Sequence, residues 1–241
     1  MEISLLNLDR SPDRLAAFHR MNAHLKSVVR IAAMDGARFS RPMLIEKKIL
    51  AEPMPDYTDG AIGCALSHLS RWEQAVLDKK PVTVAEDDAV FHRDFDTIAP
   101  AVLDSLPPDW DILLWGWNLD SILLFDMLPG MPCLGNFDQQ QLRSSIAAYQ
   151  QSPIRPGTFR LTRAFGTVGY SVSPAGAERL YNHCVPIRPM DTFYPGLDRT
   201  LPNTGIDRMM NEAYPSLQSY VCFPPLVVTE NDHTKSTVLP G

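Results

Sequence analysis

The sequence Pro81-Val82-Thr83-Val84-Ala85-Glu86-Asp87-Asp88 is a short apolar run that ends in three consecutive carboxylates. Its β-branched residues are typical of a strand. Side chains alternate between faces on an extended backbone, so we expect Glu86 and Asp88 on one face and Asp87 on the other. A hard cation, which prefers oxygen ligands, or protonation relieves repulsion between adjacent acids. The stretch therefore predicts a cation site at a strand end, and a solvated acidic turn is the plainer alternative.

Helix and strand patterns alternate on both sides of this stretch. Helix patterns are expected at 11–25, 61–78, 94–105, 173–183 and 204–211. Further strand patterns are expected at 3–6, 28–33, 112–115, 165–172 and 220–228. This alternation favours an α/β fold with a mostly parallel central sheet, covered on both faces and binding ligands beyond the carboxyl ends of its strands. The pattern weakens at 118–163, which predicts an insertion or flap, and a flexible tail is expected from about residue 230.

Composition limits the class of protein. The chain has 241 residues, a length that suits a single domain over 1–241. A formal charge of -6 argues against a nucleic acid as the main partner. No run reaches the length of a transmembrane helix, and no signal peptide pattern opens the chain. The cysteines form no CxxC pair, so we expect reduced thiols and a cytoplasmic protein. They are Cys64, Cys133, Cys184 and Cys222.

The predicted helix at 61–78 carries two stripes. Ile62, Leu69 and Trp72 belong to an aliphatic and aromatic stripe at helical spacing. Cys64, Ser67, His68 and Arg71 form a small polar line beside it. Periodicity alone favours a satisfied, buried or boundary histidine at position 68.

A first family resemblance concerns the acids. Ala85-Glu86-Asp87-Asp88 resembles the acidic pocket of phospho-acceptor receiver domains, and the segment Ile122 to Met131 is similar to their strand with the phosphorylated aspartate. That resemblance would make Asp126 the acceptor. Receiver domains also need a lysine after a later strand, and none occurs between Lys80 and Lys235. The first 80 residues would have no counterpart.

A second resemblance uses most of the chain apart from roughly 118–160. Its motifs occur in the order Ile3 to Arg14, Ala33-Met34-Asp35-Gly36, Gly60 to His68, Glu86-Asp87-Asp88-Ala89, Gly169 to Ala177 and Ile206-Asp207. Together they resemble glycosyltransferase family 25, which includes bacterial lipooligosaccharide galactosyltransferases and animal collagen galactosyltransferases. The resemblance implies a GT-A-type, Rossmann-like sandwich that binds a nucleotide sugar.

In that family an Asp-x-Asp-like element holds a divalent metal, and Glu86-Asp87-Asp88 would be that element here. The metal neutralises charge on the diphosphate leaving group. Asp88 is the first choice as metal ligand, with Glu86 or Asp87 contacting ribose or a metal-bound water. His233 would complete the metal shell. Mn²⁺ or Mg²⁺ fits an all-oxygen site better than Zn²⁺.

The resemblance also assigns donor contacts. The loop after the first strand would meet the base, ribose and phosphates of a UDP-sugar, and the polar stripe of the helix at 61–78 would join it. Arg14 has an alternative role as a solvated or capping residue, and Asp35 as a turn former. The candidate donor-binding residues are Asn7, Leu8, Arg10, Arg14, Asp35, Cys64, Ser67, His68, Glu86 and Asp87.

Sugar transfer further requires a general base beside the acceptor hydroxyl. Asp207 is the first candidate and Asp191 the reserve. The function implied is inverting transfer of a hexose, galactose above all, from UDP to a glycan or glycolipid of bacterial lipooligosaccharide or lipopolysaccharide, with peripheral contact to the inner membrane surface. A catalytically silent carbohydrate-binding relative is the alternative. Trp115 and Trp117 could stack on sugars, although core positions are their default.

Overall fold

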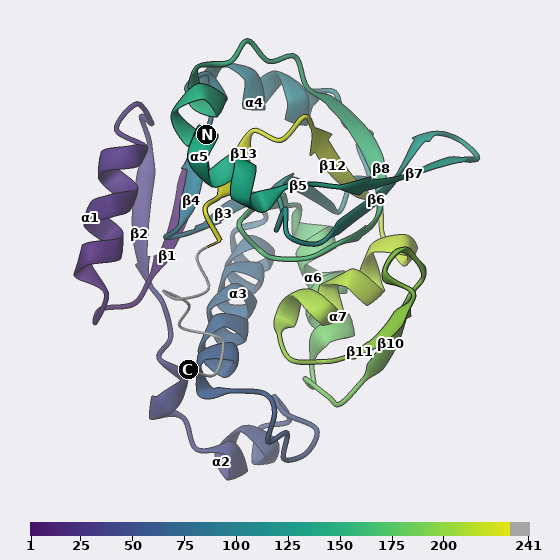
Figure 1. The fold of residues 1–241 in the computed structure, drawn as a ribbon. Coiled ribbons are helices and arrows are strands. Elements are labelled where there is room, and N and C mark those ends of the chain that lie inside the picture. The colour runs from purple at the N-terminus through teal and green to yellow at the C-terminus, as the bar shows by residue number, and fades with distance from the viewer. Residues whose placement is uncertain (232–241) are drawn as a thin grey trace.

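Nine strands form one mixed sheet in the computed structural model, which describes residues 1–231 (Figure 1). The sheet order is β2-β1-β3-β9-β5-β12-β8-β6-β7, and two small two-stranded pairs, β10–β11 and β4–β13, lie outside it. The strands are β1 Ile3–Asn7, β2 Val28–Ala32, β3 Val82–Glu86, β4 Ala89–Phe91, β5 Ile112–Gly116, β6 Ile122–Leu128, β7 Met131–Asn136, β8 Gly157–Ala164, β9 Gly169–Val172, β10 Asp191–Tyr194, β11 Arg199–Pro202, β12 Ser219–Phe223 and β13 Val227–Thr229. The helices are α1 Pro12–Met21, α2 Arg41–Glu46, α3 Asp59–Asp78, α4 Phe95–Asp104, α5 Gln139–Gln151, α6 Pro174–Cys184 and α7 Ile206–Ala213.

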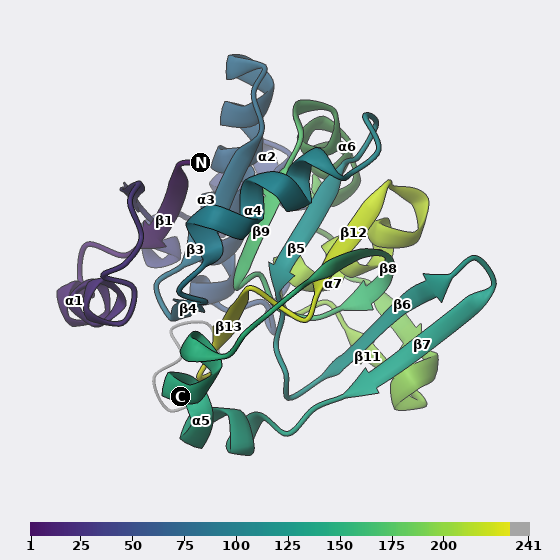
Figure 2. The ribbon, with the colours of Figure 1, turned by 90° about the horizontal axis from the view of Figure 1, so that it is seen from above.

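Side-chain alternation along the central strands supplies two cores, one on each face of the sheet. Leu6 of β1 and Val84 of β3 belong to the core beneath α3, α6 and α7. Leu5 and Ala85, their neighbours in sequence, belong to the core beneath α1 and α4. Figure 2 shows α3, α4 and α6 clustered around the strands from above. The expected α/β fold with helices on both faces is confirmed.

The expectation of a mostly parallel sheet is wrong. Only three of its eight neighbouring pairs are parallel, namely β1–β2, β1–β3 and β5–β12. The strand β9 runs antiparallel to both neighbours, β3 and β5, and so interrupts the parallel part. Antiparallel β8, β6 and β7 complete one side. Hydrophobic periodicity shows which face of the sheet a residue occupies, and not the direction in which its strand runs. The strand directions could therefore not be predicted from the sequence.

Regular elements fill the segment 118–163. The hairpin β6–β7 turns through Pro129-Gly130, where Gly130 has a φ of 78°, a conformation that suits glycine. This hairpin extends away from the rest of the sheet (Figures 1 and 2). The helix α5 and most of β8 also fall here. That this segment is an insertion or flap stays a prediction.

The receiver-domain alternative is wrong. Asp126 lies inside β6, opposite Pro132 and Arg160, and not in a loop at a strand end. In the sheet order β6 is five places from β3, which corresponds to roughly 24 Å at about 4.8 Å per strand. Asp126 therefore cannot share a pocket with Asp87 and Asp88.

The predicted helix at 61–78 is confirmed and begins two residues earlier. Its cap is Thr58, whose hydroxyl accepts a hydrogen bond from the Ala61 amide at 3.0 Å. The first helix is shorter than expected and ends at Met21. Trp115 and Trp117 are 0% and 1% exposed, so both have core roles. Within residues 1–231, no helix combines the length and apolarity needed to cross a bilayer.

Candidate functional site

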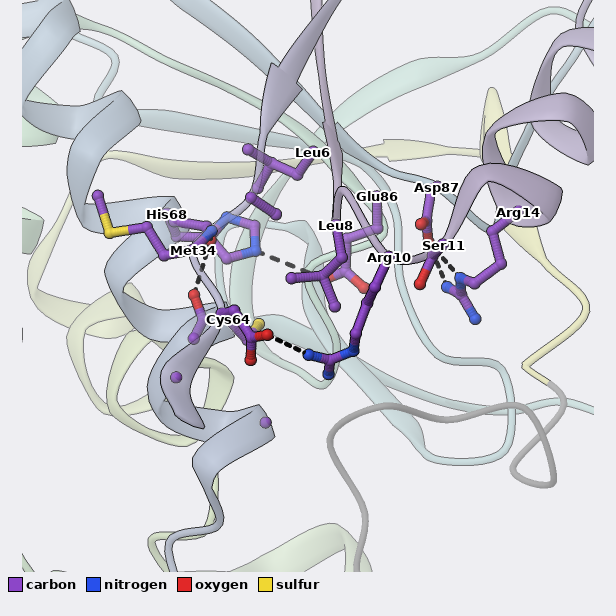
Figure 3. A pocket seen from close by; sticks show the side chains of 16 residues that line it. Leu6, Leu8, Arg10, Ser11, Arg14, Met34, Cys64, His68, Glu86 and Asp87 are labelled. Atoms are coloured by element: carbon purple, nitrogen blue, oxygen red, sulfur yellow. Dashed lines mark hydrogen bonds and ion pairs between the residues drawn. The ribbon is translucent and has the colours of Figure 1, made fainter. Parts of the chain in front are cut away.

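An open cleft of about 580 Å³ lies at the carboxyl ends of β1 and β3, the position expected for a ligand site in an open α/β sheet (Figure 3). Nine of the ten residues assigned to donor binding line the cleft. They are Leu8, Arg10, Arg14, Asp35, Cys64, Ser67, His68, Glu86 and Asp87.

Two glycines let a loop pack against α3 at the cleft. A Cβ at Gly36 would lie 1.8 Å from the Asp59 carbonyl oxygen, and a Cβ at Gly63 would lie 2.4 Å from the Met34 carbonyl oxygen. Ser67 secures the same loop, because its hydroxyl accepts from the Met34 amide at 2.8 Å and donates to the Gly63 carbonyl at 2.7 Å. Close packing between their backbones thus explains why Ala33-Met34-Asp35-Gly36 and Gly60-Ala61-Ile62-Gly63 occur in the same chain.

Asn7 is the one donor candidate outside the cleft lining. It is 1% exposed, and its amide nitrogen donates to Asp87 Oδ2 at 2.7 Å and to the Ser11 carbonyl at 3.1 Å. Its side-chain oxygen accepts from Arg30 Nε at 3.1 Å. These bonds occupy the whole amide, so Asn7 positions Asp87 and the loop instead of facing a ligand.

Asp87 is held by Arg14. Arg14 Nε donates to Asp87 Oδ1 at 2.7 Å, and Arg14 Nη2 contacts the same oxygen. With Asn7 on Oδ2, both oxygens of Asp87 are engaged inside the protein. Arg14 Nη2 also lies 3.8 Å from Asp88 Oδ2. The arginine therefore offsets the charge of the acidic triplet, which explains how three adjacent acids are tolerated.

Glu86 faces the opposite wall of the cleft. Its Oε1 accepts a hydrogen bond from Thr167 Oγ1 and lies 3.5 Å from His68 Nε2. Burial raises the pKa of Glu86, but His68, Thr167 and Arg14 together outweigh burial and hold the pKa below its ordinary value. Glu86 is therefore a carboxylate at neutral pH.

A chain of buried polar groups orients His68. Trp72 Nε1 donates to the Tyr170 hydroxyl at 2.9 Å, and that hydroxyl lies 2.9 Å from His68 Nδ1. The two ring nitrogens of His68 therefore face different partners, Nδ1 the Tyr170 hydroxyl and Nε2 the Glu86 carboxylate. Tyr170 was missed as a site residue, since no local pattern reveals a contact across 102 positions.

Cys64 and Asp35 complete the cleft walls. Burial, followed by the charges of Glu86 and Asp207, raises the pKa of the Cys64 thiol well above its usual value. Arg10 Nη1 pairs with Asp35 Oδ2 at 2.5 Å, and Arg10 holds the pKa of Asp35 below its ordinary range. Because the Arg10 side chain is 52% exposed, this ion pair can exchange with a ligand at little cost.

Asp88 lies in a neighbouring cleft of about 590 Å³, which Arg14 and Asp87 also line. The expectation that Glu86 and Asp88 share a face is wrong, because β3 ends at Glu86 and the chain turns at Asp87-Asp88 before β4. Burial, then the charge of Glu86, raises the pKa of Asp88 to about 7 although Arg14 opposes the shift. Its Oδ1 is buried and accepts no hydrogen bond.

These contacts test how well the acids suit a hard cation. Asp88 fits, because a buried oxygen without a donor and a carboxyl crowded by acids are both stabilised by a cation. Asp87 does not fit while Arg14 and Asn7 hold both of its oxygens. Glu86 lies on the other side, beside His68 and Cys64, and these three residues form a group that could bind a metal. His233 lies outside the described residues.

The two candidate general bases, Asp207 and Asp191, lie on different elements. Asp207, at the start of α7, accepts a hydrogen bond from the Gly166 amide on Oδ2 at 3.0 Å, and it lies close enough to Cys64 to raise the pKa of that thiol. Asp191 is exposed at the start of β10 and does not line the cleft. Neither aspartate lines the cleft, and of the two only Asp207 is near enough to act on the cleft residue Cys64.

Comparisons with known proteins agree with this arrangement of motifs. A family model described as glycosyltransferase family 25 (LPS biosynthesis protein) matches residues 1–194. Human procollagen galactosyltransferase 2 is 26% identical over 214 residues, which cover 80% of this chain and 30% of that protein. A probable inactive glycosyltransferase 25 family member 3 from Rattus norvegicus is 25% identical over 230 residues, which cover 88% of this chain and 34% of that protein. The chain thus spans about a third of the length of these curated relatives.

One solved structure, mouse xyloside xylosyltransferase 1 in its apo form, aligns with a TM-score of 0.37 and 11% identity. The alignment covers 76% of this chain and 70% of the mouse chain.

Proposed function

Because the chain belongs to glycosyltransferase family 25, we propose that it transfers a hexose, galactose in the first instance, from a UDP-sugar to a hydroxyl group of a glycan. The name of the human relative supports galactose, and the family description supports a lipopolysaccharide acceptor. We further propose a GT-A-type mode of binding, action in the cytoplasm, and peripheral contact with the inner membrane surface where the lipid acceptor is found.

The observation that carries the proposal is the cleft at the ends of β1 and β3, where residues from four separate motifs meet. Leu8 supplies an apolar surface for a flat base, and Asp35 supplies a carboxylate for ribose hydroxyls. Arg10 reaches the donor phosphates by leaving its exposed pair with Asp35. Arg14 stays paired with Asp87 and adds a positive charge to this wall of the cleft.

Asp88 would hold a divalent cation, Mn²⁺ or Mg²⁺, with donor phosphate oxygens and water as further ligands. When bound, such a cation neutralises charge that develops on the departing diphosphate. The protein's own part is to hold Asp88 with one buried oxygen that has no hydrogen-bond donor, where a cation would favour the ionised carboxylate.

Asp207 is our choice for the base. The Gly166 amide fixes Oδ2, which leaves Oδ1 to accept the proton of the acceptor hydroxyl as that oxygen attacks the anomeric carbon. The proton moves to Asp207, the bond to UDP breaks on the opposite face of the sugar, and the anomeric configuration inverts.

The test combines binding with turnover. Purified protein is assayed for UDP release and thermal stabilisation with UDP-galactose and other UDP-hexoses, in Mn²⁺ or in EDTA, since a ligand of the folded state raises its stability. We expect UDP-galactose with Mn²⁺ to give both signals. Asp88→Asn should lower turnover about 100-fold or more, because several kcal/mol of charge stabilisation are lost.

The matched control is Asp104→Asn, which removes an exposed acid at the end of α4 and should leave turnover unchanged. If UDP-sugars bind without turnover, the chain is a silent carbohydrate-binding relative. If none of them binds in the presence of Mn²⁺, the assignment of this cleft to a nucleotide sugar is wrong.

A further inference from the structure

Cys64, His68 and Glu86 form a compact group at the floor of the cleft. One ligand atom from each, the thiol sulfur, a ring nitrogen and a carboxylate oxygen, lies within 4.8 Å of the other two. Cys64 and His68 are four residues apart on α3 and therefore share a helix face, while Glu86 ends the adjoining strand β3. Figure 3 shows the three side chains converging from these two elements.

His68 has a ring nitrogen that the fold leaves unsatisfied. The residue is 0% exposed, and its Nε2 forms no hydrogen bond. That atom points at Glu86 Oε1, 3.5 Å away. Two ligand atoms about 2.1 Å from a tetrahedral ion lie about 3.4 Å apart, so this pair already has the spacing of two ligands of one metal.

The other ring nitrogen of His68 is fixed in the manner of metal-binding histidines. The Tyr170 hydroxyl lies 2.9 Å from Nδ1, and Trp72 donates to the same hydroxyl. A metal-bound histidine usually has such a partner on its second nitrogen, which sets the ring orientation and leaves the first nitrogen for the metal. Tyr170 and Trp72 therefore orient the His68 ring without any contribution from a metal.

The donor set selects the metal. Thiolate and imidazole ligands suit Zn²⁺, whereas the carboxylate and water ligands of Asp88 suit a hard cation. We propose that Cys64, His68 and Glu86 bind one Zn²⁺ ion, with its fourth position open to the cleft. This site is distinct from the hard-cation position at Asp88, and it depends on the three ligands alone and not on any sugar donor.

Metal binding is tested on the whole chain in the absence of nucleotide sugars. Metal-stripped protein is titrated with Zn²⁺ by calorimetry and with Co²⁺ by absorption, since a cobalt–thiolate bond gives an intense near-ultraviolet band. We expect one ion per chain and a thiolate band. Cys64→Ala and His68→Ala should weaken Zn²⁺ binding about 100-fold or more, and Tyr170→Phe should weaken it about 10-fold, as expected for a group that orients a ligand.

One variant serves as the control. Cys133→Ala removes a half-buried thiol on β7 and should bind Zn²⁺ like the parent. Thermal unfolding identifies variants that fail to fold, and Cys64→Ser then replaces Cys64→Ala. The proposal is wrong if Zn²⁺ binds as tightly to folded Cys64→Ala or Cys64→Ser as to the parent, if Cys133→Ala removes the thiolate band, or if the parent binds no Zn²⁺. Failure of sugar transfer alone would leave these outcomes unchanged.

Discussion

At the scale of single residues, the acidic triplet is divided among three environments. Glu86 faces His68, Asp87 is held by Arg14 and Asn7, and Asp88 retains a buried oxygen without a donor. Three identical charges in sequence thus have three different chemical settings. Asp88 is the member of the triplet whose ionisation the fold opposes. Its pKa of about 7 lies in a range where the change of protein stability with pH can be measured.

The first prediction concerns Asp88 and pH, in EDTA. The carboxyl is protonated below about pH 7 in the folded state and ionised above pH 3.8 in the unfolded chain. The folded state therefore binds the extra proton, and stability falls as pH rises from about 4 to about 7. The shift corresponds to about 4 kcal/mol without screening. Since the side chain is 36% exposed, solvent reduces this to roughly 1–2 kcal/mol.

Asp88→Asn removes this penalty. Urea unfolding should show the variant roughly 1–2 kcal/mol more stable than the parent at pH 8 and of equal stability at pH 4. Asp104→Asn is the control and should follow the parent at both values. An Asp88→Asn variant that is no more stable than the parent at pH 8 would contradict the burial of this charge.

At the scale of elements, the contact between the loop at Gly36 and the first turns of α3 governs the cleft wall. In an isolated helix, Gly→Ala stabilises by about 1 kcal/mol. At Gly63 the new Cβ would lie 2.4 Å from a backbone oxygen and 2.7 Å from the Gly36 nitrogen, and neither atom can rotate away.

We therefore predict that Gly63→Ala lowers the free energy of unfolding by about 2 kcal/mol or more, the reverse of its helix propensity. Urea denaturation measures the change. The control is Gly157→Ala in β8, where the nearest atoms, at 3.3 Å, belong to the Phe159 ring, which can adjust. A stabilised Gly63→Ala variant would show that the loop and the helix are not in contact.

Elements also show where sequence reasoning succeeds and fails. The helix α3 was predictable, because its apolar residues recur at helical spacing over 20 residues. The cleft was predictable in outline, because carboxyl ends of neighbouring parallel strands meet at one edge. The role of Asn7 was not, since its partners Arg30 and Asp87 are 23 and 80 positions away. The antiparallel direction of β9 was not predictable either, because no local sequence pattern shows the direction of a strand.

At the scale of the whole molecule, the strand β12 occupies the interior of the nine-stranded sheet. It lies between β5 and β8, although it is the last strand of that sheet in sequence. Val221 of β12 is 0% exposed, while Val29 of the edge strand β2 is 41% exposed. The same substitution at the two valines therefore compares the centre of the sheet with its edge.

We predict that Val221→Ala destabilises the protein by about 2 kcal/mol, because a buried side chain leaves a cavity, and that Val29→Ala changes stability by about 0.5 kcal/mol or less. Chemical denaturation of both variants provides the comparison. Equal effects at the two positions would be incompatible with a central β12.

The central place of β12 also bears on the order in which this protein can form during synthesis. Ser219 pairs with Ile112, so a ribosome must deliver more than 100 further residues after β5 before the sheet gains its missing interior strand. Until then β5 and β8 lack the neighbour that separates them, and each presents unpaired backbone groups that can bind other chains. A polypeptide interrupted before residue 219 would lose the middle of its sheet and not an edge, so partial products should aggregate instead of persisting as smaller folded proteins.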